Sequence, residues 1–422
     1  MAGKFHQIGF YALAAVFTIV VVASASEFIA DDAVGYYIAG HFANLNDWTF
    51  VYPYGFPAES RDAMDFRSQV AALNIRPEPG FSPFIYPPLW AKVLGLANSL
   101  LEFGQFKYVM AAIVAVSLLL MAEAARHIVD ASIDPAKALL LQIGLWATTT
   151  AGFVILNELQ FQAFVSALIL CAFWLGSTDR PNSAGLCLAL AASIKLTPAL
   201  LIVLWIAQRK WRPLIAFAMF GGALGLLSLG LAGIEAHQTY LAAIGLLNES
   251  VVVRYTSLGL NAVYAILFDP TLSGVFSGKA PDSYQDFKIA IPTLQAILPR
   301  IGLVALLGFV AWRGQHLFGK AILSKGLGSL ILIIALIAPL SWSHHYLSAF
   351  MLIPLFYLRS QNPFWLWTFG LCLFCLSMFW VFLILEDRIL LTITMPLIGS
   401  AFTLFYLSIL IGRSRNSEIH RG

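Results

Sequence analysis

The sequence predicts an all-α integral membrane protein, a helical bundle that crosses the bilayer many times. Of its 422 residues, 59% are hydrophobic and 11% are charged, whereas soluble globular domains average about 25% charged residues. Apolar runs long enough to cross a hydrocarbon core, roughly 20 residues each, recur along the chain. They do not alternate polar and apolar residues as the strands of a membrane barrel would. We therefore expect residues 1–422 to form one domain with about 12 membrane segments.

The first apolar run extends from about Ile8 to Ser26 and is preceded by Lys4. The triplet Ala23-Ser24-Ala25 also resembles the cleavage site of a secretory signal peptide. Because the run is long for the apolar core of such a peptide, we expect a signal anchor that is retained as the first membrane helix.

Residues 27–105 are expected to form a first periplasmic region with surface helices. The stretch after the first run is acidic and rich in Pro, Gly and Tyr, and cytoplasmic loops usually carry the excess of Lys and Arg. Within it, Tyr86-Pro87-Pro88-Leu89 predicts the start of a helix, because proline is tolerated in a first turn. This helix could cross the membrane or lie flat on its outer surface. The flat placement leaves more basic residues on the cytoplasmic side, so we favour it.

The later spans are predicted from apolar length and from the positions of basic residues. A turn at Asn157–Gln160 joins two of them on the outer side, and a second periplasmic region covers residues 233–288. Both termini are then cytoplasmic. The predicted spans lie at about 106–128, 136–156, 159–175, 213–232, 289–312, 321–340, 346–358, 364–385 and 390–411.

The segment from Ser183 to Ala207 is long enough for one crossing but has basic residues beyond both ends. Its centre is Lys195-Leu196-Thr197-Pro198, where the proline interrupts helical hydrogen bonding. A lysine within the membrane is costly and is by default functional. Broken helices are tolerated only where they line protein or water. We therefore predict two half-helices that meet at Lys195 and present it to a cavity open on the outer side.

This topology gathers polar side chains on the outer side. Asp32 follows the first span, and the cationic groups Lys195, Arg254 and His344 come from distant parts of the chain. A carboxylate that faces cations suits transfer from a phosphate-linked lipid donor. The carboxylate can act as a general base on an acceptor hydroxyl, and the cations can stabilise the charge that builds on the departing phosphate. Further candidate site residues are Asp31, His345, Glu158, Gln160 and Tyr86.

Each candidate also has a structural interpretation. Asp31 and Asp32 could cap the helix that follows them, since aspartate is a good N-cap residue. Lys195 could extend its side chain to the membrane interface, and Arg254 could be an ordinary loop charge. The two adjacent histidines could belong to an interfacial aromatic belt, and Glu158 could be a solvated turn residue.

Other kinds of site lack their sequence signatures. The chain contains neither a glycine-rich phosphate loop nor the His-Glu-x-x-His metal motif. His344 and His345 are adjacent, so their side chains project differently and are poorly placed to share a metal. No run of basic residues suggests a nucleic-acid partner.

Four short motifs follow one another between positions 32 and 345. The stretch DAVGYYIA begins at Asp32, Phe84–Leu89 reads FIYPPL, Lys195–Pro198 reads KLTP, and Ser341–His344 reads SWSH. They resemble the D-F-x-x-[FY]-[FY]-x-A, F-x-Y-P-P-L, K-x-x-P and S-W-x-H motifs of glycosyltransferase family 87. This family comprises bacterial enzymes of the GT-C fold and includes polyprenol-phosphate-mannose-dependent mannosyltransferases. The family often has Gly-Gln where this chain has Leu159-Gln160.

The resemblance implies a GT-C-type bundle and an inverting transfer of a sugar, mannose or another hexose. The donor would be a polyprenyl-phosphate sugar, and the acceptor a hydroxyl of a glycolipid or glycan. The active site would face the periplasm from the bacterial inner membrane, among membrane lipids, with no cofactor or metal. The doubled acidic start leaves Asp31 or Asp32 open as the base, and the spacing of the aromatic residues favours Asp32.

Three other functions fit parts of the pattern. A transporter or flippase of lipid-linked sugars also carries polar groups within helices, but it needs access from both membrane faces, whereas these groups gather on one. A polysaccharide polymerase or ligase shares the donor class. A non-catalytic membrane scaffold would not need Lys195 within the membrane. The sequence identifies neither the sugar nor the acceptor.

Overall fold

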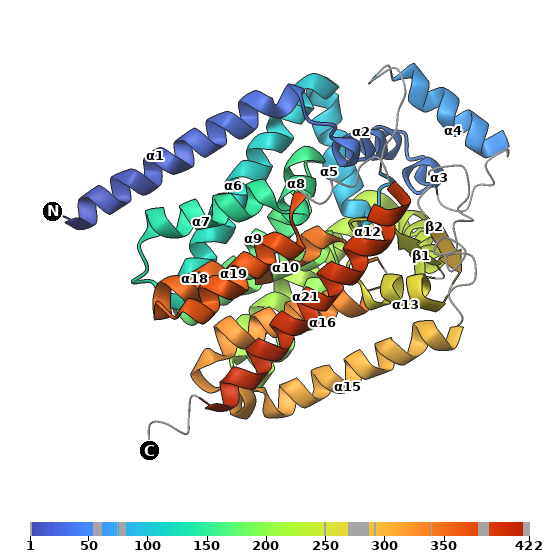
Figure 1. Ribbon diagram of the computed structural model, residues 1–422. Coiled ribbons are helices and arrows are strands. Elements are labelled where there is room, and N and C mark those ends of the chain that lie inside the picture. Colours follow the sequence, from blue (N-terminus) through green and yellow to red (C-terminus); the bar gives the residue numbers. More distant parts are fainter. Residues whose placement is uncertain are drawn as a thin grey trace.

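Helices make up nearly all of the regular structure in the computed structural model (Figure 1). Helix α1 (Ala2–Ala23) lies along one edge of the bundle and α15 (Thr293–Phe318) along the opposite edge. The structure describes residues 2–53, 61–73, 75, 82–248, 250–268, 287–290, 293–338, 340–378 and 388–416.

Among the described residues, five helices are long and apolar enough to cross a membrane, which makes the chain a multi-pass membrane protein. A sixth crossing results if the bent pair α8–α9 is one span. The total of about 12 segments, which also counts shorter apolar helices, stays a prediction. The five segments are Gln7–Ser26, which includes the short η1 (Ser24–Ser26), Phe103–Asp130 (α6), Trp211–Asn248 (α12), Pro299–Phe318 and Thr392–Gly412, the last within α21 (Arg388–Asn416).

Helix α6 is the central span of the first half of the bundle. It packs against α1 on one side and α9 (Gln162–Ser177) on the other. The most apolar stretch of α6 is 56% buried, whereas the corresponding stretches of α1 and α12 are each 11% buried. The exposed leucines and isoleucines of α1 and α12 therefore face outward, where they can contact lipid.

The span predicted at 136–156 is wrong as a single helix. It consists of α7 (Pro135–Thr148) and α8 (Thr150–Asn157), separated by Thr149 in an extended conformation. Three consecutive threonines explain the break, because the Thr149 hydroxyl accepts a hydrogen bond from the Gly152 amide and so caps a new helix. Helix α8 then meets α9 at a bend of 114°.

The prediction of two half-helices meeting at Lys195 is confirmed. Helix α10 (Pro181–Ile194) ends at Lys195, whose backbone is extended. The chain resumes as a short 3₁₀ turn, η2 (Thr197–Leu201), and continues as α11 (Ile202–Ala207). Pro198 stands in the first turn of η2, where its missing N–H costs no helical hydrogen bond.

Helix α12 changes direction at Gly233, the residue at which the second outer region was predicted to begin. Gly233 has a φ of 77°, a backbone conformation that favours glycine. The imidazole of His237 bridges the break, with contacts to the Gly233 carbonyl at 2.7 Å and the Ser228 hydroxyl at 2.9 Å. The break divides α12 into two parts, and residues of the second part lie near Lys195.

The second predicted outer region contains strands as well as helices. β1 (Ser250–Val253) pairs antiparallel with β2 (Phe287–Ala290), with Ser250 opposite Ala290. Helix α13 (Leu260–Phe268) follows β1. This small sheet is a departure from the predicted all-α class. The Pro/Gly/Ser-rich tip near 277–283 lies outside the described residues.

Between α15 and α21, the described chain folds as a series of short helices. Turns η3 and η4 lead into α16, and a turn, η5, that carries His344 and His345 separates α16 from α17. The predicted span at 364–385 extends beyond the described residues at 378. The elements are η3 (Gly319–Ala321), η4 (Ile322–Gly326, a π turn), α16 (Leu327–Ile337), η5 (Ser343–Tyr346), α17 (Leu347–Phe350), α18 (Leu352–Ser360) and α19 (Pro363–Cys375).

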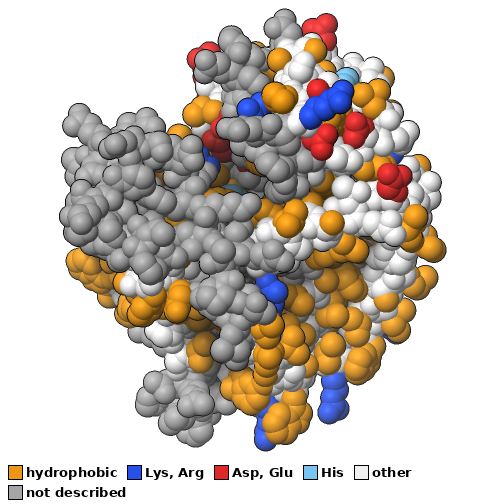
Figure 2. Space-filling view, turned by 90° about the vertical axis from the view of Figure 1, so that its right-hand side faces the viewer, with side chains coloured by type: hydrophobic (Ala, Val, Ile, Leu, Met, Phe, Trp, Pro, Cys, Tyr) orange, Lys and Arg blue, Asp and Glu red, His pale blue; other side chains and the backbone are white. Residues whose placement is uncertain are grey.

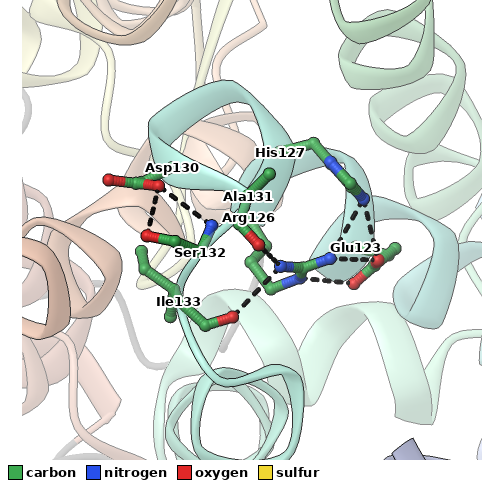
Figure 3. A network of polar contacts seen from close by, with 7 residues as sticks. All are labelled: Glu123, Arg126, His127, Asp130, Ala131, Ser132 and Ile133. Carbon is green, nitrogen blue, oxygen red and sulfur yellow. Dashed lines mark hydrogen bonds and ion pairs between the residues drawn. The ribbon is translucent and has the colours of Figure 1, made fainter. Parts of the chain in front are cut away.

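A polar network closes the end of α6 that lies far from Asp32 (Figure 3). Arg126 donates to both carboxylate oxygens of Glu123, at 2.8 and 2.6 Å, and to the carbonyls of Ala131 and Ile133. The guanidinium thereby satisfies two carbonyls of the turn between α6 and α7. The adjacent His127 stacks on Trp174 of α9, with ring centroids 4.5 Å apart.

The described part of the first predicted outer region is helical and packs onto the bundle. It comprises α2 (Asp31–Asn44), α3 (Trp48–Val51), α4 (Arg61–Ala72) and α5 (Pro88–Leu100). With 13 residues, α5 is not among the candidate spans; it packs against α2 and α12. The helices α2 and α5 approach closely at Gly40 and Gly95.

Gly40→Ala should destabilise the protein, because the added Cβ would lie 2.7 Å from the Leu94 backbone carbon and 2.9 Å from the Gly95 nitrogen. Backbone must move to make room, at a cost of about 1–3 kcal/mol. Thermal unfolding in detergent should show a lower Tm. Gly104→Ala is the matched control, because a Cβ there meets nothing within 4 Å. Equal Tm values for the two variants would refute close packing at Gly40.

Candidate active site

Asp31 and Asp32 form the first turn of α2, and neither occupies its N-cap position. That position belongs to Ala30, which has a left-handed backbone with a φ of 58°. The N-cap interpretation of the two aspartates is therefore wrong. Asp32 is buried, with 6% of its surface exposed, whereas Asp31 is half-buried. The burial of Asp32 has to be explained by its surroundings.

The turn between α8 and α9 holds the start of α2. The Ala30 amide donates to the carbonyl of Asn157 at 2.8 Å, and the Asp31 amide donates to a carboxylate oxygen of Glu158 at 2.9 Å. The Asn157 side chain donates to the other Glu158 oxygen at 3.1 Å. These contacts satisfy amides that a helix start leaves free. Glu158 is thus a structural ligand of α2 rather than a solvated turn residue.

Ser82 reaches Asp32 because α2 has no side chain at Gly35. A Cβ on Gly35 would lie 2.0 Å from the Ser82 carbonyl oxygen. The Ser82 amide donates to the Asp31 carbonyl at 3.2 Å, and its side chain hydrogen-bonds the Asp32 carboxyl. Ser82 was not among the predicted site residues, since a lone serine between prolines has no signature of its own.

Burial raises the pKa of Asp32 to about 7. The hydrogen bond from Ser82 and the positive charge of Arg254 lower the pKa, while the negative charges of Glu158 and Asp31 raise it. Burial dominates because desolvation disfavours the charged form. Helix α2 is not a candidate span, so this carboxyl lies outside the candidate membrane spans. A carboxyl of this kind can accept a proton near neutral pH.

Gln160 and two tyrosines form a hydrogen-bonded group beside Asp32. The hydroxyls of Tyr36 and Tyr86 lie 3.1 Å apart, and they donate to the Gln160 side-chain oxygen at 3.2 and 3.3 Å. Tyr36 also accepts from the Phe161 amide at 3.2 Å, and their rings stack 4.5 Å apart. The group ties α2 to the α8–α9 turn. Leu159, where the family often has glycine, has a left-handed φ of 54°.

Lys195 and the side chains that contact it form a second group of site residues. Its ammonium nitrogen is 3.2 Å from the Gln162 side-chain oxygen and 2.6 Å from Nε2 of His345. Two positive charges 2.6 Å apart would repel by about 6 kcal/mol at an effective dielectric constant of about 20. Lys195 and His345 therefore do not both carry a positive charge. Lys195 and Asp32 are close enough to interact electrostatically.

His344 is buried beside this pair. It is 4% exposed, and its Nδ1 has no hydrogen-bond partner among the described residues. Its ring is 4.6 Å from that of His345. Burial lowers the pKa of His344 well below its ordinary value. A buried polar atom without a partner is costly, so Nδ1 is a candidate ligand-binding atom and the aromatic-belt interpretation does not account for it.

Arg254 follows β1 and enters the same region. Its positive charge acts on both Asp32 and Glu158, and its guanidinium lies 5.8 Å from the centre of the Tyr255 ring. The segment beside it is fixed to η5, because the Ser343 amide donates to the Thr256 carbonyl at 2.7 Å. The structure thus brings Arg254 and His344 together from sequence positions ninety residues apart.

A cavity of about 220 Å³ adjoins these groups. A cavity needs only about 10–15 Å³ to hold one water molecule, so this cavity has room for a much larger ligand. Lys195, Gln162, His345 and Ser348 line it at one place, and the remaining lining is mostly apolar. The apolar lining residues include Ile244 and Leu247 of α12, Ile331 and Ile334 of α16, and Leu196 and Leu201 at the broken helix.

Figure 2 shows the side of the molecule on which α4, α13 and the β1–β2 pair lie. The Asp and Glu side chains visible in this view are in its upper half, and hydrophobic side chains cover most of its lower right. The acidic side chains visible in this view thus lie above its large hydrophobic surface.

All nine predicted site residues lie in one region, around Asp32 and Lys195. Three residues of the site, Tyr36, Ser82 and Gln162, were not among the predicted site residues. Tyr36 lies within the DAVGYYIA stretch, and Gln162 is a polar residue at the start of an apolar helix, so both could have been found.

Comparison with known proteins agrees with the geometry. The sequence model of glycosyltransferase family 87 matches residues 84–339, which is more than half of the chain. The chain belongs to glycosyltransferase family 87. The family match includes Tyr86, Lys195 and Arg254, whereas Asp32 and His344 lie outside it.

One curated relative is a polyprenol-phosphate-mannose-dependent alpha-(1-2)-phosphatidylinositol pentamannoside mannosyltransferase of Mycolicibacterium smegmatis. It is 25% identical over 289 residues, which cover 67% of this chain and 62% of the relative. The matched part thus spans less than two thirds of the relative's length. No solved structure matches the chain.

The raised pKa of Asp32 predicts that stability falls with pH. The folded protein binds the Asp32 proton more tightly than the unfolded chain, so wild type loses stability as pH rises from 3.8 to about 7. Asp32→Asn cannot ionise and should be more stable than wild type above this range, by at most about 4 kcal/mol.

Thermal unfolding in detergent at about pH 5 and about pH 8 would measure this effect. The Tm advantage of Asp32→Asn should be larger at the higher pH. Asp31→Asn makes the same change at the more exposed neighbour and serves as the control. An advantage that does not vary with pH would mean that Asp32 is not buried as described.

Proposed function

We propose that this protein is a membrane glycosyltransferase that transfers a sugar from a polyprenyl-phosphate donor to an acceptor hydroxyl. The observation that carries the proposal is a buried carboxyl, Asp32, within electrostatic reach of Lys195 at the head of a mostly apolar cavity. The family and the polyprenol-phosphate-mannose-dependent relative support the donor class. The sugar is mannose or another hexose, and the acceptor is a glycolipid or glycan.

Asp32 is the general base in this proposal. It takes the proton of the acceptor hydroxyl as that oxygen attacks the anomeric carbon of the sugar. A pKa of about 7 suits the role, because a base works best when its pKa is near the operating pH. The attack displaces the phosphate from the opposite face, so the anomeric configuration inverts. Ser82 orients the carboxyl, and Glu158 holds the helix turn that carries it.

Lys195, Arg254 and His344 bind the donor phosphate in this proposal. The bond between the anomeric carbon and the phosphate oxygen breaks, and its electron pair stays on the phosphate. Positive charge and hydrogen-bond donors in a water-poor site stabilise that developing charge. The proposal assigns this task to side chains and includes no metal or cofactor. The prenyl chain occupies the apolar part of the cavity, where Ile244 and Ile331 line it.

We place this site at the periplasmic face of the bacterial inner membrane. The acidic first region and the positive-inside rule support that orientation. A donor whose lipid tail stays in the bilayer while its head reaches a boundary site also fits this placement. In the same orientation, the Glu123–Arg126 network lies on the cytoplasmic side.

Asp32→Asn should reduce sugar transfer by at least about 100-fold, because general-base catalysis typically contributes 10²–10⁴-fold. Purified protein would be incubated with candidate polyprenyl-phosphate sugars and lipid acceptors, and product mass would be followed. Asp31→Asn should retain most of the activity. Near-normal turnover by Asp32→Asn would sink the base assignment. Movement of an unchanged lipid-linked sugar across vesicles would favour a flippase instead.

His344→Ala should weaken the response to the donor by roughly 10-fold or more, because a hydrogen bond to a charged group contributes about 1.5–3 kcal/mol. The measurement is the dependence of initial rate on donor concentration. His316→Ala, at an exposed position of α15, is the matched control. If the two variants show the same donor dependence as wild type, His344 does not bind the donor.

A further inference from the structure

The contact between Lys195 and His345 restricts where their protons can be. Nδ1 of His345 accepts from the Trp342 amide at 3.3 Å, so Nδ1 carries no proton. A neutral imidazole must then carry its proton on Nε2. Nε2 is the atom that lies 2.6 Å from the Lys195 nitrogen. The hydrogen bond therefore runs from Nε2–H of His345 to the lone pair of an uncharged Lys195 amine.

The other contacts of Lys195 agree with an amine. An uncharged amine has one lone pair and two N–H donors, and one N–H reaches the Gln162 oxygen at 3.2 Å. An ammonium would instead direct an N–H at the Nε2–H of His345. The described titratable groups that face the pair are Asp32 from α2, His344 from η5 and Tyr240 from α12. Of these, Asp32 favours positive charge on Lys195.

We propose that the Lys195–His345 pair is uncharged in the empty site and takes up one proton when a phosphate group binds. The phosphate oxygen replaces His345 as the partner of Lys195. The amine then becomes an ammonium, and both it and Nε2–H of His345 donate to the phosphate. The site thus acquires its cation together with its anion. This inference rests on the proposed function, since it concerns the same donor site.

The charge balance of the reaction explains the use of such a pair. The donor phosphodiester carries one negative charge. After the sugar leaves, the lipid product is a phosphomonoester with two negative charges, and Asp32 holds the proton of the acceptor. A protonated Lys195 offsets the added charge on the phosphate. When the product leaves, the pair returns its proton to solvent, and Asp32 does the same.

The test is calorimetric titration of the full chain in detergent with farnesyl phosphate, a short prenyl phosphomonoester. At about pH 8 the free monoester is dianionic, because its second pKa is near 6. Repeating the titration in buffers of different ionisation enthalpy yields the number of protons bound with the ligand. All proteins carry Asp32→Asn, which removes the neighbouring carboxyl and prevents turnover. The Asp32→Asn parent should take up about one proton per ligand.

His345→Gln should abolish most of this uptake, since the amide oxygen accepts from an ammonium and leaves Lys195 charged before the ligand arrives. Lys195→Arg should do the same, because arginine is always charged. His316→Gln is the matched control and should keep the uptake of the parent. Zero uptake by the parent, or full uptake by both pair variants, would overturn the proposal. The latter would place the proton on the phosphate itself.

The experiment distinguishes failure of the Lys195–His345 inference from failure of the proposed function. Proton uptake on farnesyl phosphate binding, in a protein that transfers no sugar, would keep the Lys195–His345 inference and refute the transferase. Sugar transfer by wild type without proton uptake by the Asp32→Asn parent would keep the transferase and refute the inference.

Discussion

The hydrogen bonds between the α8–α9 turn and the start of α2 are the contacts on which the rest of the site depends. A helix start leaves amides without partners, and in a buried place these must be satisfied by protein. The Asn157 carbonyl and the Glu158 carboxylate do so for Ala30 and Asp31. The acidic partner also suits the positive end of the helix dipole. As a result, Asp32 is buried. Ser82 hydrogen-bonds its carboxyl, and the positive charge of Arg254 acts on it.

The buried groups of the site carry little charge. Asp32 is buried enough to hold a proton near neutral pH, and Lys195 contacts the neutral His345. Isolated charges in an apolar interior are costly, so groups tend to neutralise or pair. In the proposed transfer, the donor supplies an anion for Lys195 and the acceptor hydroxyl supplies a proton to Asp32. The same low charge keeps the cavity compatible with a lipid chain.

Breaks in the helices create the room for this chemistry. Lys195 lies where α10 gives way to η2, α7 gives way to α8 at Thr149, and α12 bends at Gly233. Each break has a local cause: a proline at 198, a threonine cap at 149, and a glycine with a left-handed backbone. Close packing of α2 on Ser82 and α5, through Gly35 and Gly40, then fixes the position of the helix turn that carries Asp32.

The sequence alone determined the class of the protein and the chemical candidates. Apolar length predicted the spans, Pro198 beside Lys195 predicted the broken helix, and the residue types around Asp32 predicted a base with cationic partners. These are local properties, since hydropathy and proline act on their own segment of chain. The sequence did not predict the β1–β2 pair, because its two strands are distant in the chain. The break at Thr149 has a local signal, three consecutive threonines, but hydropathy alone does not register it.

Only the tertiary structure decided between Asp31 and Asp32 as the buried carboxyl. The two are identical in type and adjacent, so only their surroundings distinguish them. The same holds for the histidines: His345 contacts Lys195, while Nδ1 of His344 has no hydrogen-bond partner in the described part of the chain. Burial and proton position depend on which atoms from other helices come within a few ångströms, and that proximity is a property of packing rather than of any local stretch of sequence.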